Sequence, residues 1–180
     1  MSTFLELFSK FDAARTDKTV SSSLLAFLLQ QEQDLQFTSF NSEDAIALGL
    51  AILAESPRAA DPSALPVVVS IIVNGHVFFY SAQDGTALDN EKWIARKVAT
   101  VNRWGHSTLY QASAAWASGT TLPERFLVAK EEFAAAGGGF PLFIKGVTYP
   151  VGVISVSGLP HYIDHDVVTR GIKKFLDGKK

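Results

Sequence analysis

The fold is decided by the stretch PVVVSIIV (residues 66–73), which is followed by Asn74-Gly75 and then by HVFFY (76–80). Both flanking runs are rich in β-branched and aromatic residues, which favour extended strands. Asn-Gly is the strongest short signal for a two-residue hairpin turn, because both residues accept positive φ angles. The sequence therefore predicts an antiparallel hairpin here.

A second pair of strands is predicted toward the carboxyl end, over about 140–145 and 147–156, with a turn near Lys145-Gly146. Residues 35–40 alternate apolar and polar side chains, which is typical of a short half-buried strand. Strands joined by tight hairpins pair antiparallel. We therefore expect an α/β chain of the α+β class, with one antiparallel sheet of about five strands. Rossmann and barrel folds are excluded, because their strands alternate singly with helices.

Helical periodicity occupies most of the remaining chain. Apolar side chains at helical spacing predict helices over about 4–13, 22–33, 42–55, 90–104, 108–118, 123–136 and 162–176. Residues 21–23 are N-cap candidates for the second of these helices, Gly105 is placed to end the fourth, and Thr108 with Gln111 forms a candidate capping box for the fifth. Residues 45–54 are apolar nearly all round, which predicts deep burial or a subunit interface.

Composition bounds the class of protein. The 180-residue chain is 47% hydrophobic and has a net charge of −2, so we expect one domain over 1–180, with 1–34 as its helical N-terminal part. It lacks the basic balance of most nucleic-acid binders. No basic leader precedes an apolar stretch at the start, and the apolar runs 45–54 and 66–73 are shorter than the roughly 20 residues that span a bilayer. We expect a cytoplasmic protein without a nucleic-acid partner or membrane insertion.

The chain contains no cysteine. This excludes disulfides, Cys-ligated zinc, iron–sulfur clusters, thiolate-ligated haem and a cysteine nucleophile. Any metal or haem chemistry must therefore use other side chains, of which the four histidines are the first to consider.

Basic residues line one face of the helix predicted over 90–104. At about 100° per residue, Lys92, Arg96 and Arg103 fall within about 40° of one another. This stripe fits a clamp for carboxylates, propionates or phosphates, and it equally fits a solvated face or salt bridges between subunits. Lys97 instead projects among apolar residues, so it either snorkels along the core edge or reaches a buried acid or a ligand.

Two groups of histidines are candidates for ligands. His106 lies in a tight turn between two predicted helices, near Trp104 and Tyr110, and it could ligate a metal or haem or hydrogen-bond its own loop. His161 and His165 are spaced i,i+4 at the start of the last helix, so together with Asp164 they could share a divalent ion. An acidic residue at a helix start is also favourable with the helix dipole alone.

Two motifs carry a family resemblance. GGFP (138–141) followed by VGVISVSGLP (151–160), with Asp164-His165 soon after, resembles the haem-degrading domains of the GlcG and HbpS type. Asn90-x-x-Trp93-Ile-x-Arg96-Lys97, followed by Arg103-x-Gly105-His106-Ser107, resembles one branch of that family, catalogued as an uncharacterised protein family. That branch includes a fungal member linked to the delivery of tail-anchored membrane proteins. The glycines at 137–139 precede a strand rather than a helix, which favours a helix stop over a phosphate loop.

The resemblance implies a profilin/PAS-like antiparallel sheet with helices on its faces, compact homo-oligomers, and binding or breakdown of haem. Since cysteine is absent and the single methionine is the initiator, a usual axial ligand of haem must be His or Tyr. On the branch motif, His106 is the best candidate, with Lys92, Arg96 and Arg103 meeting propionates.

Two rival hypotheses remain open. In the first, the protein is a non-enzymatic oligomeric adaptor in protein targeting, in which His106 ties its own turn and the basic stripe meets an acidic partner. In the second, it is a small-ligand or metal-binding module that uses His161, Asp164 and His165. The sequence does not decide whether the protein is an enzyme.

Overall fold

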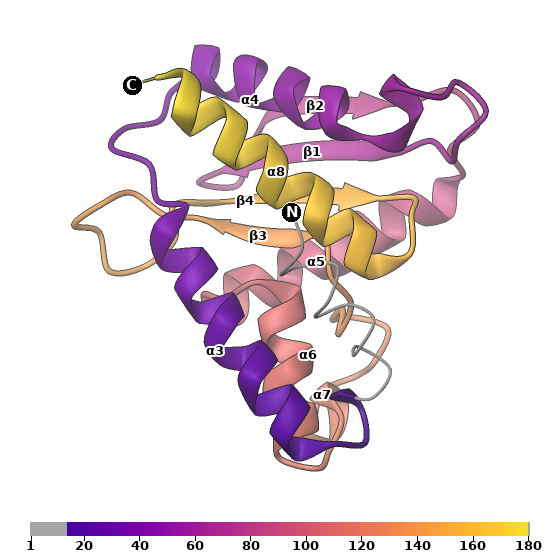
Figure 1. The fold of residues 1–180 in the computed structure, drawn as a ribbon, viewed down its shortest axis with the longest axis vertical. Helices are drawn as coiled ribbons and strands as arrows, with labels where there is room; N and C mark the ends of the chain where they lie inside the picture. Colours follow the sequence, from indigo (N-terminus) through magenta and orange to yellow (C-terminus); the bar gives the residue numbers. More distant parts are fainter. Residues whose placement is uncertain (1–13, 180) are drawn as a thin grey trace.

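The computed structural model describes residues 14–179, so the helix predicted over 4–13 lies outside the described part of the chain. The elements, labelled as in Figure 1, follow in the order α3 (Lys18–Asp34), α4 (Ser42–Glu55), the 3-10 turn η1 (Pro57–Ala59), β1 (Val68–Val73), β2 (His76–Ala82), α5 (Leu88–Trp104), α6 (Thr108–Ala117), α7 (Leu122–Phe126), β3 (Gly139–Leu142), β4 (Gly152–Ser157) and α8 (His161–Gly178).

The sheet has four antiparallel strands in the order β2-β1-β4-β3. The predicted hairpin is confirmed: Asn74 and Gly75 adopt φ angles of 48° and 82°, and Val73 pairs with His76. Helices α4 and α8 lie over one face of the sheet and α5 lies behind the other (Figure 1). This layered arrangement confirms the α+β class and the single antiparallel sheet.

The predicted strand at 35–40 is not a fifth member of the sheet. Only an isolated parallel bridge joins Phe37 to Ile144, made by hydrogen bonds from Phe37 N to Phe143 O and from Lys145 N to Phe37 O. The alternating pattern reflects the burial of Phe37, whose ring packs edge-on against Phe40. The segment connects α3 to α4, so its course is set by these two helices.

The main hydrophobic core lies between the sheet and the pair α4 and α8. Two glycines allow the close approach of these layers. A Cβ at Gly49 would stand 2.4 Å from the ring of Phe79 on β2, and a Cβ at Gly171 would stand 2.5 Å from Ile52 on α4. A second cluster, formed by Ala14, Leu24, Leu28 and Leu109, joins α3 to α6.

Helix α4 is apolar on more sides than the core covers. Ala45, Leu48 and Ile52 are fully buried, whereas Ile46 and Leu50 are 52% and 58% exposed. Deep burial is thus confirmed for one face, and the interface role of the other face stays a prediction. Among the described residues, no helix combines the length and the apolarity that crossing a membrane requires.

Three predicted helix boundaries are wrong. The side chain of Asp17 caps α3 by accepting hydrogen bonds from two backbone N–H groups, so the helix begins before the predicted cap at 21–23. Ser107 rather than Thr108 caps α6, because the hydroxyl of Thr108 turns inward to accept from Gly139 N. The helix predicted over 123–136 ends at Phe126, since backbone groups beyond it bind α5 instead.

The contact of Gly171 with Ile52 generates a test of the packing between α8 and α4. We expect Gly171→Ala to lower the free energy of unfolding by about 1–3 kcal/mol, because the added methyl overlaps Ile52. Gly178→Ala, at the end of the same helix, meets nothing within 4 Å and should be neutral or slightly stabilising. Urea unfolding of both variants measures the difference, and equal stabilities would contradict the packing.

Candidate functional site

A buried carboxylate holds His106 in place. Glu32, on the last turns of α3, is only 2% exposed. Its Oε2 lies 2.7 Å from Nδ1 of His106, and its Oε1 accepts a hydrogen bond of 2.7 Å from the backbone N–H of Ser107. We call Glu32, His106 and Tyr110, described next, the His106 site.

The turn between α5 and α6 positions the imidazole. Gly105 ends α5 in the left-handed conformation at a φ of 71°, and a Cβ there would stand 3.0 Å from the ring of Tyr149. Ser107 then caps α6 by accepting from Tyr110 N. The rings of His106 and Tyr110 stack with centroids 4.2 Å apart and an interplanar angle of 22°. The sequence-predicted proximity of the two rings is thereby confirmed.

This geometry leaves one imidazole nitrogen for external contacts. A carboxylate at Nδ1 favours the tautomer that donates Nδ1–H, which places a lone pair on Nε2. The side chain of His106 is 33% exposed. Carboxylate–histidine pairs of this kind orient metal-ligating imidazoles and raise their basicity as ligands. Burial, followed by the charge of Glu32, raises the pKa of Tyr110, so its phenol stays protonated.

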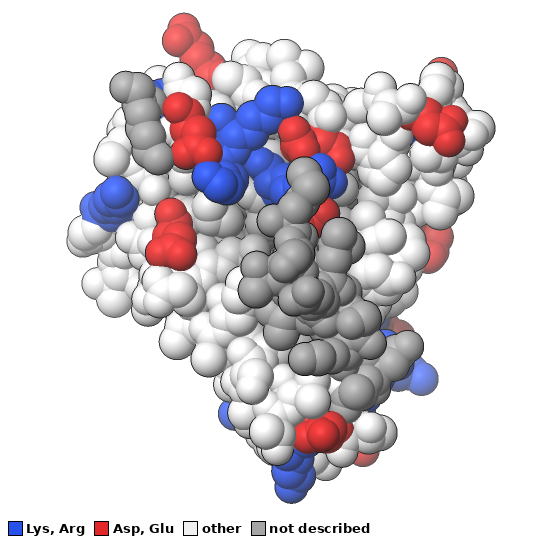
Figure 2. Space-filling view, in the orientation of Figure 1, with Lys and Arg blue, Asp and Glu red and all other residues white. Residues whose placement is uncertain are grey.

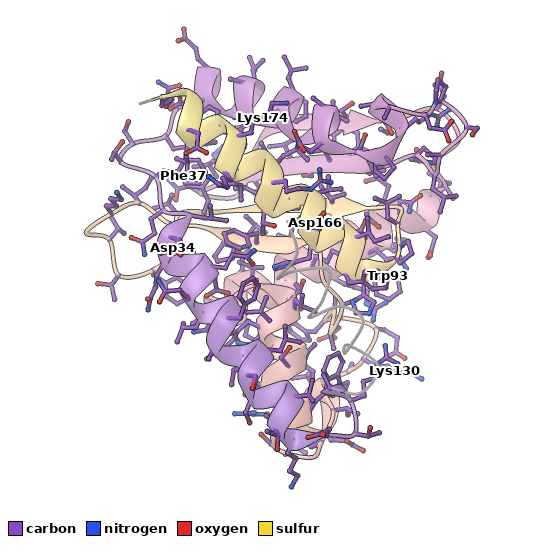
Figure 3. The ribbon with its side chains drawn as sticks, viewed as in Figure 1. Asp34, Phe37, Trp93, Lys130, Asp166 and Lys174 are labelled. Atoms are coloured by element: carbon purple, nitrogen blue, oxygen red, sulfur yellow. The ribbon has the colours of Figure 1, made fainter. Side chains whose placement is uncertain are left out.

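The three basic residues predicted to form a stripe on α5 have different surroundings in the structure. Arg96 donates to the carbonyls of Lys130 and Phe133 at 2.6 and 3.2 Å, and its guanidinium lies 4.2 Å from the ring centroid of Trp93. It therefore fastens the 130–133 segment to α5, near Trp93 and Lys130 in Figure 3. Lys92 and Arg103 remain exposed, with Arg103 over the Trp104 ring.

Lys97 reaches a buried acid, which is one of the two outcomes that the sequence left open. Its Nζ lies 2.9 Å from Oδ2 of Asp164 and donates to the carbonyl of Val156 at 2.6 Å. Both side chains are almost fully buried. Burial lowers the pKa of Lys97 and raises the pKa of Asp164, and the attraction between the two charges opposes both shifts.

The predicted metal ligands each have a separate partner. Asp164 faces the Lys97 ammonium, Gly137 N donates to Nδ1 of His161, and Nε2 of His165 lies 2.9 Å from Oε1 of Gln31. Within residues 14–179, no group of three or more His, Asp or Glu side chains converges on a point where a metal ion could bind. His161, Asp164 and His165 are therefore each engaged in a different contact rather than arranged around one point.

Sequence reasoning missed Glu32. It lies 74 residues before His106 along the chain, so no local motif joins the two. A weak signal was present, because Glu32 continues the buried positions Leu24 and Leu28 at a spacing of four. A charged residue on the apolar face of a helix needs a buried partner.

The sequence and the fold are both similar to those of known proteins. A model of the family described as "Haem degrading protein HbpS-like" matches residues 40–173. A UPF0303 protein of Schizosaccharomyces pombe is 36% identical over 154 residues, which cover 85% of this chain and 84% of the relative. The crystal structure of the Ybr137w protein has a TM-score of 0.77 at 31% identity, covering 87% of this chain and 90% of that one. The crystal structure of HbpS has a TM-score of 0.56 at 25% identity, covering 78% and 92%.

The burial of His165 generates a pH-dependent stability. Burial, assisted by the charges of His161 and Lys97, lowers the pKa of His165 from 6.5 to about 3. Between pH 6.5 and about pH 3, His165 is therefore protonated in the unfolded chain but neutral in the folded chain. Stability is fully present above pH 6.5 and is lost progressively as the pH falls from 6.5 toward 3, by up to about 1.4 kcal/mol per pH unit.

Urea unfolding at several pH values measures this slope. We expect His165→Gln to flatten it, since glutamine does not titrate. His76→Gln, at an exposed hairpin position, should keep the slope of the unsubstituted protein. An unchanged slope in His165→Gln would contradict the assignment.

Proposed function

The chain belongs to the HbpS-like family of haem-degrading proteins, and on this premise we propose that it is a cytoplasmic oligomer that binds haem or a related small ligand through His106. The family and branch that the two sequence motifs predicted are confirmed. The observation that carries the proposal is the pairing of Nδ1 of the partly exposed His106 with the buried carboxylate of Glu32, which leaves Nε2 as the ring nitrogen that this carboxylate does not bind.

Elimination among the candidate ligands supports His106. His165 is fully buried, with Nε2 already at Gln31, and Nδ1 of His161 accepts a backbone N–H. His76 is exposed on the hairpin between β1 and β2. The buried carboxylate of Glu32 contacts His106 and not His76. The phenol of Tyr110 is stacked and its raised pKa disfavours a phenolate ligand. His106 thus combines partial exposure with a carboxylate partner, which is the chemistry of a haem-ligating imidazole.

Arg103 is the basic residue best placed for a propionate. It precedes His106 by three residues and is exposed at the end of α5. Lys92 lies about 16 Å further along the same helix. When bound, haem would supply an iron centre for redox chemistry. The chain's own contribution is the orientation of the imidazole by Glu32 and the positive charge of Arg103.

Haemin titration of the purified protein tests the proposal. We expect a shifted, saturable Soret band, and we expect His106→Ala to weaken binding by at least about tenfold, the equivalent of about 1.4 kcal/mol. His76→Ala removes an exposed histidine outside the His106 site and should bind as the unsubstituted protein does. The proposal fails if the unsubstituted protein shows no saturable band, or if His106→Ala binds equally well.

A second surface supports the oligomeric part of the proposal. β2 is an edge strand, and it contains no lysine or proline of the kind that protects exposed edges. Four large side chains on β2 and on α4, which packs against β2, are between 47% and 61% exposed: Ile46 and Leu50 on α4, and Val77 and Tyr80 on β2. We call these four residues the β2-edge surface, and the occupant we propose for it is a second copy of the chain.

The adaptor hypothesis uses the same surface. A non-enzymatic adaptor would assemble through the β2 edge while His106 serves only to tie the turn between α5 and α6. The two functions differ at His106, so the haemin titration separates them, whereas assembly is common to both.

Light scattering coupled to size exclusion tests the β2-edge surface. We expect a mass that is a multiple of the 19.5 kDa chain, reduced to one chain by Leu50→Glu with Val77→Lys, because burying either charge is costly. Leu127→Glu is a matched control, since Leu127 is 93% exposed outside this surface. A monomeric unsubstituted protein would contradict the proposal.

A further inference from the structure

A large groove lies between α3 and α8 on the face of the molecule seen in Figure 1. Its volume is about 1140 Å³, and it is bordered by the second half of α3, the connecting residues 35–39, Lys145 and the part of α8 from Asp166 onward. Figure 3 labels Asp34 and Phe37 on one side of this region and Asp166 on α8. We call it the α3–α8 groove. The His106 site contributes no residue to its lining, so the two are separate.

Most charged side chains of the groove neutralise one another. Figure 2 shows basic and acidic side chains intermingled over α8. The ion pairs of the lining residues are Arg170–Asp166 at 2.8 Å, Lys173–Asp177 at 2.6 Å and Lys179–Asp44. Lys145 differs, because it forms no ion pair with any residue between 14 and 179. It is therefore the one lining cation, within the described part of the chain, whose charge no carboxylate offsets.

Hydrogen-bond donors lie beside Lys145. Its backbone N–H donates to Phe37 O at 2.8 Å, which holds the turn after β3 against the connecting residues 35–39. Thr38 and Ser39 come next after Phe37, and both line the groove and are exposed. Among residues 14–179, neither hydroxyl has a hydrogen-bond partner. This edge of the groove thus presents an ammonium and two hydroxyls, all of which can donate to an anion.

Gln31 adds a donor that α8 holds in place. Its Oε1 lies 2.9 Å from Nε2 of His165. Burial lowers the pKa of His165 to about 3, so the imidazole is neutral at pH 7. Because an amide oxygen only accepts hydrogen bonds, Nε2 of this neutral ring must carry the hydrogen. The oxygen of Gln31 is therefore committed to α8, and its NH2 group keeps its donors for a ligand in the groove that Gln31 lines.

Apolar side chains supply the rest of the lining. Leu35 and Phe37 are buried members of the main core that also border the groove. Phe27 on α3 and Leu176 on α8 are half-buried, so part of each side chain can be covered by a ligand. The volume lies just above the roughly 300–1,000 Å³ of typical small-molecule pockets, which combine apolar walls with a few placed polar groups.

We propose that the α3–α8 groove binds a small amphipathic monoanion, a molecule with one carboxylate on an apolar body. The carboxylate meets Lys145 and the hydroxyls of Thr38 and Ser39, and the apolar body covers Phe27 and Leu176. A second negative charge is disfavoured, because Asp34 also lines the groove and is bound by the neutral amide of Gln30 rather than by a cation. The proposal uses no residue of the His106 site, so it stands independently of haem binding.

Isothermal titration calorimetry with two probes, below the concentrations at which micelles form, tests the proposal. Laurate carries its carboxylate on a flexible chain, and 2-naphthoate carries it on a rigid ring. We expect saturable binding of at least one probe, with one molecule per chain. Binding of laurate alone identifies a chain as the apolar body, and binding of 2-naphthoate alone identifies a ring. If neither binds saturably, the proposal is overturned.

Two analogues without the carboxylate test the role of the charge. Dodecyltrimethylammonium keeps the twelve-carbon chain, and 2-naphthol keeps the ring. We expect each to bind at least about tenfold more weakly than the probe it matches, since neither offers an anion to Lys145. Equal affinities would show that the groove takes up apolar molecules without selecting an anion, which contradicts the proposal.

Charge reversal locates the carboxylate. Lys145→Glu should weaken binding of the probe by at least about tenfold, and the exposed position of Lys145 leaves the fold intact. Lys130→Glu makes the same change of charge at a side chain that is 80% exposed and lies outside the groove (Figure 3), so it should bind as the unsubstituted protein does. Unchanged affinity in Lys145→Glu would overturn the proposal.

Two further substitutions locate the apolar body and separate the groove from the His106 site. Leu176→Asp should weaken binding, whereas Leu127→Asp, at a side chain 93% exposed outside the groove, should not. Cooperative urea unfolding checks that Leu176→Asp is folded; Lys145→Glu decides the matter if it is not. His106→Ala should keep the full affinity for the probe. A loss of affinity there would place the probe at the His106 site and contradict the proposal.

Discussion

The ion pair between Lys97 and Asp164 connects the two helical layers of the molecule. Lys97 projects from α5 on one face of the sheet, and Asp164 projects from α8 on the other. They meet at the end of β4, where the Lys97 ammonium also donates to Val156 O and Asp164 accepts from Leu159 N. This buried ion pair therefore ties the position of α5 directly to that of α8.

The glycines at 137–139 make room for this contact. A Cβ at Gly138 would stand 2.7 Å from Nζ of Lys97 and 2.6 Å from the carbonyl of Val156. The absence of a side chain at Gly138 therefore lets the backbone pass close to β4 and to the Lys97 ammonium. Because burial disfavours both charges, the pair need not stabilise the fold more than apolar residues would. Removing one partner, however, leaves the other as an unpaired charge in the interior. Helix α5 leads directly into Gly105 and His106. A displacement of α5 would therefore move the His106 imidazole relative to Glu32.

Much of the fold was predictable because its signals are local. The Asn74-Gly75 turn, the glycine that ends α5 and the cap of α4 each depend on neighbouring residues. The partners of His106 and Lys97 were not predictable, since they lie 74 and 67 residues away. The early end of α7 has the same cause: Ala134 N donates to Thr100 Oγ1 on α5, and such a tertiary contact overrides local helix preference.

A double-mutant cycle on Lys97→Met and Asp164→Asn tests most directly whether the buried pair joins the layers. The free energy of unfolding is measured in urea for the unsubstituted protein, both single variants and the double variant. We predict that each single variant loses about 3–5 kcal/mol and that the double variant loses clearly less than their sum, because neither charge is then left alone. Additive losses would mean that the two side chains act independently, and they would contradict this central role of the pair.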